Sequence, residues 1–371
     1  FQAEDGIRDV ERSRGLGDVY KRQDKKCVRL VKGDFDNKTE YEMSPVEQAS
    51  KYKDHGFKNL HIVDLDGALT GESTNLDIKI NHIQFVGSHN SYKQAMPDGF
   101  VKQLMKVNPG LLDSLEYEHI PLSDQLDLGI RKLELDVFYL ADEERFLVGH
   151  VQQIDMNSNC TSLRICLNQI IAWSQNNPTH SPIWISFNAK DDYIFGLPSP
   201  QPFSQEAFIL MDSIIEEKLG EKLIRPKDIV DLKWPLLDKA RGKFILILDE
   251  GGAKRDMYYE GWQQRPMFTN APEGHPAAAI MIINDPIREF DEIQRLVKAG
   301  YMIRTRADAD TREARDNDTS RKIAAFKSGA QVVSTDYYLP ATHFGNGYQV
   351  SLPQPVQCNP VTAPDHCQIK N

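Results

Sequence analysis

The sequence predicts an α/β protein whose larger, carboxyl-terminal part is a (β/α)8 TIM barrel, preceded by an incomplete β-α-β fragment. Three observations support this prediction. Apolar runs of strand length alternate with amphipathic helical patterns, two histidines and a pair of carboxylates stand at the ends of such runs, and the composition is that of a globular protein. A parallel barrel gathers the carboxyl ends of its strands at one mouth, so we expect these polar residues to converge there.

Composition and charge exclude two classes of protein. The 371 residues are 40% hydrophobic and 26% charged, with 44 basic and 54 acidic side chains, so the net charge is −10. This charge argues against binding to nucleic acid, which requires clustered lysine and arginine. Apolar runs such as Phe244 to Leu248 are of strand length, and none approaches the ~18 residues of a membrane span. We therefore expect a protein without a transmembrane segment.

Four of the five cysteines form two close pairs in the sequence. Proximity favours the disulfides Cys160–Cys166 and Cys358–Cys367 over the other pairings or four free thiols, and Cys27 stands alone. Two disulfides would indicate an oxidising compartment. Residues 1–23 carry ten charges and no apolar segment of the kind found in a secretory signal.

The chain divides into three pieces. Residues 1–23 lack hydrophobic periodicity, and we expect them to be solvated rather than packed. Residues 24–78 read as a strand at 27–31, a helix that begins at Ser44-Pro45 and runs to about residue 55, and a strand at 60–67. A β-α-β unit of this size is below the length at which a core usually supports itself.

The third piece, residues 79–371, carries the barrel pattern. Eight strands with intervening helices fit a closed parallel barrel better than an open doubly wound sheet, although periodicity alone leaves both open. The predicted strands are 82–87, 131–137, 145–149, 182–187, 243–249, 279–283, 301–304 and 331–334, and the predicted helices are near 97–106, 162–175, 205–219, 289–299 and 312–328.

The candidate site residues begin at the end of the first barrel strand. There the segment IQFVGSHNSY presents His89 beside the amide of Asn90. Glu134 and Asp136 stand at i and i+2 in LELDV and therefore share one face of a strand. His150 ends a further apolar run. Two histidines and two carboxylates are the groups that metal-assisted acid–base chemistry uses.

The oxygen ligands favour a hard cation. Asn90, Glu134 and Asp136 offer carbonyl and carboxylate oxygens, which suit Ca²⁺ before Mg²⁺, whereas zinc would recruit the histidines. Two carboxylates inside a barrel require a cation or a proton to compensate them. The alternative is a solvated edge strand with one polar face.

Later strand ends supply candidate anion-binding groups. Asn188 and Lys190 share a face at i and i+2, so one could reach a metal and the other an anion; the alternative is a strand exit into a polar loop. Arg304 and Arg306 would suit a phosphate, or would form a salt-bridged loop with nearby acids. Tyr337 could stack on a ring or seal the rim of the barrel.

Several blocks in order carry a resemblance to a known family. GSHNSY, PLSDQLDLGIRKLELDVF, VGHVQQID, NPTHSPIWI, GYMIRTRADADTREAR, SGAQVVSTDYY and CNPVTAPDHC together resemble the Ca²⁺-dependent phosphoinositide-specific phospholipase C family, over essentially all of residues 80–371. The resemblance implies a TIM barrel of the phosphatidylinositol-phosphodiesterase type, usually exported. It implies that His89 and His150 are the catalytic histidines and that Asn90, Glu134 and Asp136 bind calcium. Asn188 departs from the family pattern, which has glutamate there, and this should weaken the calcium site.

A second resemblance covers residues 24–78. The segment KCVRLVKGDFDNKTEY…SPVEQASKY…LHIVDLDGALTGESTN resembles the start of the phosphoribosylformimino-AICAR ribotide isomerase of histidine biosynthesis. Asp64 and Asp66 match that family only as second-strand residues, so we expect no isomerase activity. Residues 1–23 resemble a translated sequencing adapter, which makes the chain a candidate chimera.

The expected function follows from the first resemblance. We expect calcium-dependent cleavage of phosphatidylinositol-type lipids to diacylglycerol and cyclic inositol phosphate, with Glu134 as a possible base and Asn188 as a fourth metal ligand. Phosphate would be held by Lys190, Arg304 and Arg306, and the inositol ring by Tyr337. The alternatives are a glycerophosphodiester or sphingolipid phosphodiesterase and a catalytically silent phosphoinositide-binding barrel. We expect a monomer, secreted, periplasmic or at the cell surface, that acts on lipid at a membrane.

Overall fold

The computed structural model describes residues 18–23, 26–31, 34–41, 50, 60–64, 78–107 and 109–369. The chain divides into two compact units, Phe1–Asp77 and Ile78–Asn371. The helix expected at 44–55 lies outside the described residues, apart from Ser50, and so do Asp66 and most of residues 1–23.

The first unit contains one four-stranded sheet. Its strands are β1 (Asp18–Gln23), β2 (Lys26–Val31), β3 (Asp34–Tyr41) and β4 (Leu60–Asp64), in the order β3-β2-β1-β4. The parallel partner of β4 is β1, whereas β2 and β3 pair as antiparallel neighbours. The expectation that residues 1–23 do not pack is therefore wrong for β1, because pairing through the backbone needs no apolar periodicity.

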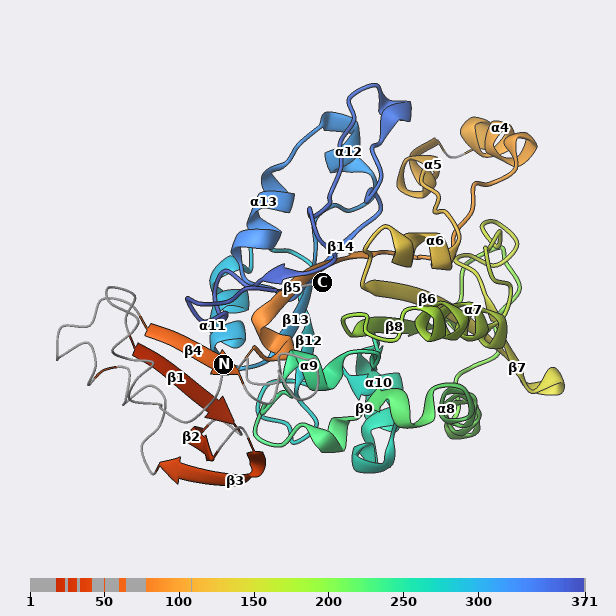
Figure 1. Cartoon of the computed structure of the whole chain (residues 1–371). Helices are drawn as coiled ribbons and strands as arrows, with labels where there is room; N and C mark the ends of the chain where they lie inside the picture. The colour runs from red at the N-terminus through yellow and green to blue at the C-terminus, as the bar shows by residue number, and fades with distance from the viewer. Residues whose placement is uncertain are drawn as a thin grey trace. The chain divides into compact units, whose positions relative to one another are not determined.

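The second unit is built on eight parallel strands. Their order is β11-β10-β8-β6-β5-β14-β13-β12, and a bridge between Asn270 and Ile280 joins the two ends of this row. The sheet thus curls into a barrel (Figure 1). The strands are β5 (Ile83–Ser88), β6 (Lys132–Leu140), β8 (Ile183–Ala189), β10 (Phe244–Leu248), β11 (Phe268–Thr269), β12 (Ile280–Ile282), β13 (Met302–Arg306) and β14 (Val332–Thr335).

Helices connect most of these strands and lie outside the sheet (Figure 1). They are α4 (Asp98–Val107), α5 (Pro109–Leu115), α6 (Leu122–Asp127), α7 (Leu163–Asn176), α8 (Gln205–Leu219), α9 (Leu237–Ala240), α10 (Gly252–Tyr259), α11 (Phe290–Ala299), α12 (Arg312–Asp316) and α13 (Ser320–Lys327). The helix predicted at 312–328 is two helices, because Asn317 adopts the left-handed conformation, with φ of 52°, that ends α12.

Three short strands lie outside the barrel row. β7 (Arg145–Val148) pairs antiparallel with β6, β9 (Leu223–Ile224) pairs parallel with β10, and β15 (Gln357–Cys358) pairs antiparallel with β5. The strand predicted at 145–149 is therefore confirmed as a strand, but it forms a hairpin with β6 and is not one of the eight strands of the barrel. Its place in the barrel belongs to the two-residue β11, which is too short to show a periodic pattern.

Alternation along the strands separates two layers of side chains. Leu133, Leu135 and Val137 of β6 pack in one cluster with helix residues, whereas Phe85, Trp184 and other apolar residues form a second cluster on the alternate face. The second face also carries Glu134 and Asp136, as expected for residues that point into the lumen. Apolar side chains thus fill one end of the barrel interior, and the polar residues lie at the other end, the mouth formed by the carboxyl ends of the strands.

Two disulfides confirm the predicted pairing. Cys160–Cys166 closes the loop before α7, and Cys358–Cys367 closes the tail after β15. Within the described part of the chain, no helix combines the length and hydropathy needed to cross a bilayer.

Candidate active site

The turn after β5 positions His89. Asn90 adopts a left-handed conformation, with φ of 45°, which turns the chain sharply just beyond the strand. Ser91 then locks the turn onto β6, because its amide donates to Glu134 O at 3.0 Å and its Oγ accepts from Glu134 N at 2.7 Å. Ser91 Oγ also lies 2.6 Å from Ser88 Oγ. The turn and the strand that carries the acids are therefore held in register.

His89 lies between two buried carboxylates. Its Nδ1 is 2.8 Å from Asp336 Oδ1, and its Nε2 is 3.5 Å from Glu134 Oε1. A carboxylate at this distance accepts, so Nδ1 carries a proton and donates to Asp336. Burial works to raise the pKa of Asp336, but the charge of His89 and its hydrogen bond hold that pKa below its usual value.

The polar face of β6 carries three charged residues that are almost fully buried. Lys132, Glu134 and Asp136 are 0%, 1% and 2% exposed. Lys132 Nζ contacts Glu134 Oε2, and Arg304 donates to the same oxygen at 3.2 Å. Burial works to raise the pKa of Glu134, but Lys132, His89 and Arg304 outweigh it and hold that pKa well below its usual range. Burial lowers the pKa of Lys132 to about 8. Glu134 is thus a carboxylate at neutral pH.

Asn188 and Lys190 approach the acidic pair from the next strand. Asn188 Nδ2 donates to Asp136 Oδ1 at 2.8 Å and lies 3.3 Å from Glu134 Oε1, and Lys190 Nζ is 3.3 Å from Asp136 Oδ2. The pairing of β6 with β8 places Asp136 opposite Asn188 and explains this convergence. Three candidate ligands, Glu134, Asp136 and Asn188, and one candidate anion contact, Lys190, therefore meet at the same mouth.

The second histidine belongs to another pair with a buried acid. His150 Nδ1 lies 2.9 Å from Asp155 Oδ2, and Lys93 Nζ lies 3.4 Å from Asp155 Oδ1. His150 follows the hairpin strand β7, whose next residue, Gly149, donates to Asp136 O at 3.3 Å. His150 is thereby held beside the carboxyl end of β6, although its strand runs antiparallel.

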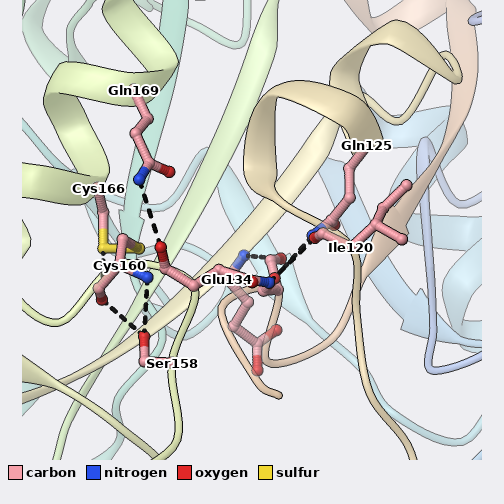
Figure 2. The surroundings of a disulfide bond; sticks show 9 residues. Ile120, Gln125, Glu134, Ser158, Cys160, Cys166 and Gln169 are labelled. Atoms are coloured by element: carbon pink, nitrogen blue, oxygen red, sulfur yellow. Dashed lines mark hydrogen bonds between the residues drawn. A yellow bond between two sulfur atoms is a disulfide. The ribbon is translucent and has the colours of Figure 1, made fainter. Parts of the chain in front are cut away.

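A backbone hydrogen bond, next to a disulfide, joins the segment after His150 to the His89 turn. Figure 2 shows the bond between Cys160 and Cys166 with Ser158, whose Oγ donates to Cys160 O at 2.6 Å. The neighbouring Asn159 donates from its backbone to Tyr92 O at 2.7 Å. The hydrogen bond of Asn159 therefore holds the segment after His150 against the turn that carries His89, and the disulfide fixes the adjacent Cys160 to α7.

The two arginines of β13 have different surroundings. The Arg304 side chain is 4% exposed and pairs with Asp249 Oδ2 at 2.8 Å as well as with Glu134. The Arg306 side chain is 17% exposed and lies 3.5 Å from Asp336 Oδ2. Of the two, Arg306 is the better placed for a ligand phosphate, and Arg304 serves the buried carboxylates.

Tyr337 stands away from the acidic pair. It is 4% exposed, its hydroxyl donates to Glu116 O at 3.2 Å, and its ring packs near Tyr348. It lines a cavity of about 660 Å³ that also reaches Asp336 and His119. Any ring that Tyr337 contacts must therefore lie in this cavity, next to the His89 pair.

Sequence reasoning missed several residues of the site. Asp336 and Asp155, which orient the two histidines, were passed over because their distance from the histidines in the sequence, 247 and 5 residues, shows no pattern. Lys132 could have been found, since it stands at i−2 from Glu134 and hence on the same face of the strand.

The residues present fit a hard cation in kind. Asn90 Oδ1 is a buried acceptor with no hydrogen-bond donor among the described residues, and two carboxylates lie in the same mouth. The Asn188 amide now turns its nitrogen toward both acids, and a rotation about its last bond would present oxygen instead. No group of three or more histidine, cysteine or acidic side chains forms a metal site within the described ranges. The oxygen set therefore depends on the two amides.

Fold and site together define a TIM barrel with paired histidines and carboxylates at the carboxyl ends of its strands. A family model described as phosphoinositide phospholipase C, Ca²⁺-dependent, matches residues 78–146 and 140–360, and the chain belongs to this family. A Pseudomonas sp. calcium-dependent phosphoinositol-specific phospholipase C, solved with myo-inositol, shares the fold at 18% identity and a TM-score of 0.51. That match covers 76% of this chain and 96% of the Pseudomonas chain.

The amino-terminal segment has other relatives. A model described as a histidine biosynthesis protein matches residues 18–86. The imidazole-4-carboxamide isomerase of Pelagibacter ubique (strain HTCC1062) is 86% identical over 56 residues, and that of Carboxydothermus hydrogenoformans is 54% identical over 54 residues. These matches cover 15% of this chain, and the chain spans less than a quarter (23% and 22%) of the length of the two isomerases.

Proposed function

We propose that residues 78–371 cleave phosphatidylinositol-type lipids on the glycerol side of the phosphodiester, releasing diacylglycerol and cyclic inositol phosphate. The inositol 2-hydroxyl attacks phosphorus and the glycerol oxygen leaves. The observation that carries the proposal is the pair of histidines, His89 and His150, each held through Nδ1 by a buried aspartate. Membership of the phospholipase C family supports the choice of substrate.

The two histidine–aspartate pairs suit acid–base catalysis. In each pair Nδ1 donates to the carboxylate, so Nε2 is the nitrogen left for the reaction. His150 protonates the departing glycerol oxygen, and such positioned acid catalysis contributes on the order of 10²–10⁴-fold. His89 donates from Nε2 to the phosphoryl oxygens, and Glu134, 3.5 Å from that nitrogen, accepts the proton of the attacking hydroxyl.

Calcium would be held by Asn90, Glu134, Asp136 and Asn188. When bound, it would act as a Lewis acid on the phosphoryl oxygen and the attacking hydroxyl. Lys190 and Arg306, which are partly exposed at the mouth, bind the phosphate. Tyr337 contacts the inositol ring from the cavity next to His89.

Product analysis tests the proposal. The full chain is incubated with vesicles of phosphatidylinositol in phosphatidylcholine, with calcium and with chelator, and the water-soluble products are separated. Cyclic inositol phosphate with an equal amount of diacylglycerol supports the proposal. Parallel incubations contain glycerophosphoinositol or sphingomyelin. Glycerophosphate from the first or phosphocholine from the second, without cyclic inositol phosphate from phosphatidylinositol, would favour the related phosphodiesterases, and vesicle binding without any product would favour a silent headgroup binder.

The disulfides support export. Cys160–Cys166 and Cys358–Cys367 persist in oxidising compartments, so we propose that this unit works in the periplasm, at the cell surface or outside the cell. Its partner would be a lipid at a membrane surface, bound by a monomer. The isomerase-like segment lacks most of the length of its relatives, and we propose that it has no isomerase activity.

A further inference from the structure

Lys132 is a buried cation for which the proposed chemistry has no task. Its side chain is fully buried in the lumen, one step below Glu134 on the same face of β6. Its ammonium contacts Glu134 Oε2 and donates to Ser88 O at 2.9 Å and to Ser334 Oγ at 3.1 Å. An ammonium has three protons, so all of its donors have acceptors.

Gly87 makes room for this lysine. The two residues lie opposite each other in the pairing of β5 with β6. A Cβ atom at position 87 would lie 2.3 Å from Lys132 Cβ and 2.5 Å from its Cδ, which is closer than side chains approach. The aliphatic part of the Lys132 side chain therefore crosses β5 at Gly87, where no Cβ atom blocks it. The space there fits a long, unbranched side chain.

The acids around the expected calcium position already have cationic partners among the described residues. Ion pairs join four carboxylates to four cations: Glu134, Asp136, Asp249 and Asp336 to Lys132, Lys190, Arg304 and Arg306. Each oxygen of the two carboxylates expected to bind calcium faces a donor. Glu134 Oε2 faces Lys132 and Arg304, Glu134 Oε1 faces Asn188, and the oxygens of Asp136 face Asn188 and Lys190.

A divalent cation must compete with this internal charge. Calcium draws its affinity from ligand charge and ligand number, and here one expected carboxylate is the amide of Asn188. Lys190 and Arg306 are partly exposed and able to turn outward, whereas Lys132 has no exposed surface and no alternative position. Its charge stays beside Glu134 whatever binds at the mouth.

We propose that Lys132 is a built-in counter-ion that weakens calcium binding and keeps the acidic pair ordered without the metal. This inference rests on the proposed function, in which Glu134 and Asp136 bind calcium. It follows that the site binds calcium at millimolar and not at micromolar concentrations, and that removing the lysine charge strengthens calcium binding at least tenfold.

Calorimetric titration of calcium into the full chain, without substrate, tests the inference. Chelator-treated wild type and Lys132→Met, which keeps the length of the side chain, are compared at pH 7 and 0.1 M salt. A millimolar dissociation constant for wild type and a value at least tenfold lower for the variant support the proposal. Micromolar affinity in wild type, or equal affinity in the two folded proteins, overturns it.

Lys190→Met is the matched control. It removes the same charge from Asp136 at a side chain that is 29% exposed, so the affinity should change less than threefold. An equal gain in both variants would show that any nearby charge has this effect and would contradict a special role for Lys132. If Lys132→Met fails to unfold cooperatively, Lys132→Gln, which also removes the charge but keeps an N–H donor for Ser88 O, takes its place under the same tenfold criterion.

The outcomes separate this inference from the proposed function. In one outcome, Lys132→Met binds calcium more tightly than wild type, but wild type releases no cyclic inositol phosphate. This result would support the counter-ion role and reject the phospholipase activity. Conversely, phosphatidylinositol cleavage by a wild type that binds calcium at micromolar concentrations would keep the activity and reject the counter-ion role.

Discussion

At the scale of single residues, each histidine of the site depends on an aspartate that fixes its proton. His89 and His150 stand where the sequence pattern placed them, after apolar runs, but neither Asp336 nor Asp155 was predictable from that pattern. A strand pattern reports which face a residue occupies, and it carries no information about a partner on another loop. The side chains of Glu134 and Asp136 were predictable because alternation alone decides their face.

Replacing His150 by alanine should remove most of the activity and little of the stability. The imidazole is 20% exposed, and its loss removes the proton donor for the leaving glycerol oxygen. We expect a 10²–10⁴-fold lower rate of phosphatidylinositol cleavage and a melting temperature within a few degrees of wild type. The control is His275→Ala, because that imidazole stacks on Tyr259 and is no part of the site. Near-wild-type turnover in His150→Ala would reject the assignment.

A buried histidine should make the fold sensitive to acid. His180 is 6% exposed and lies 2.7 Å through Nδ1 from Ser181 O and 2.9 Å through Nε2 from Ser174 Oγ. Burial lowers its pKa from 6.5 to about 4. Between these values the unfolded chain binds more protons than the folded one, so the free energy of unfolding falls as the pH drops from 6.5 toward 4.

Urea unfolding at pH 7 and pH 4.5 measures this effect. A shift of this size corresponds to roughly 2–3 kcal/mol from this one group. His180→Asn should lose stability at pH 7 and should show a correspondingly smaller decrease between the two pH values. Equal decreases in the variant and in wild type would show that other groups cause the acid sensitivity.

At the scale of helices and strands, periodicity found seven of the eight barrel strands and the helices α4, α7, α8 and α11, but it missed the short helices α5, α6, α9 and α10. The run at 145–149 is β7, but only the hydrogen bonds of the folded chain show that it turns back on β6. The barrel strand that was not predicted is β11. It consists of Phe268 and Thr269 and is too short to show a periodic pattern. Likewise, in the first unit, β4 pairs with β1, whereas β2 pairs with β1 and β3.

The disulfide of the carboxyl-terminal tail should stabilise the first barrel strand. It joins Cys358, which pairs with Ile83 of β5, to Cys367 nine residues later. Closing a loop of this length contributes about 3 kcal/mol by restricting the unfolded chain. We expect Cys358→Ser with Cys367→Ser to lower the free energy of unfolding by this amount in urea titrations. Cys27→Ser, outside the barrel unit, should leave the transition of the barrel unchanged, and an unchanged transition in the double variant would contradict the argument.

At the scale of the whole molecule, two different family models match the two parts of the chain, and their matches overlap over residues 78–86. The histidine-biosynthesis match ends within β5, and the phospholipase match begins at Ile78. Ile78 and Ile80 are 3% and 1% exposed and belong to the apolar cluster inside the barrel, and Leu237 N donates to Ile78 O at 2.7 Å. The core of the barrel unit thus includes residues from Ile78 onward.

A protein that begins at Ile78 should therefore fold and unfold as the barrel does in the full chain. We expect the melting temperature of the barrel to change by no more than about 2 °C. A protein that begins at Ile83 is the control, because it lacks two buried isoleucines and should lose roughly 3–5 kcal/mol of stability. Loss of cooperative unfolding in the longer of the two proteins would show that the amino-terminal unit is part of the fold.

The bridge between Asn270 and Ile280 determines where the barrel wall is closed. It is the joint between β11 and β12, the two strands at the ends of the row, whereas β5 and β6 lie at its middle. In the closed ring, the strands that carry His89 and the acidic pair are diametrically opposite this joint. Local opening of the sheet at this joint would therefore take place far from the strands of the candidate site. The loop 270–279 is accordingly the place where a circular permutation would disturb the chemistry least.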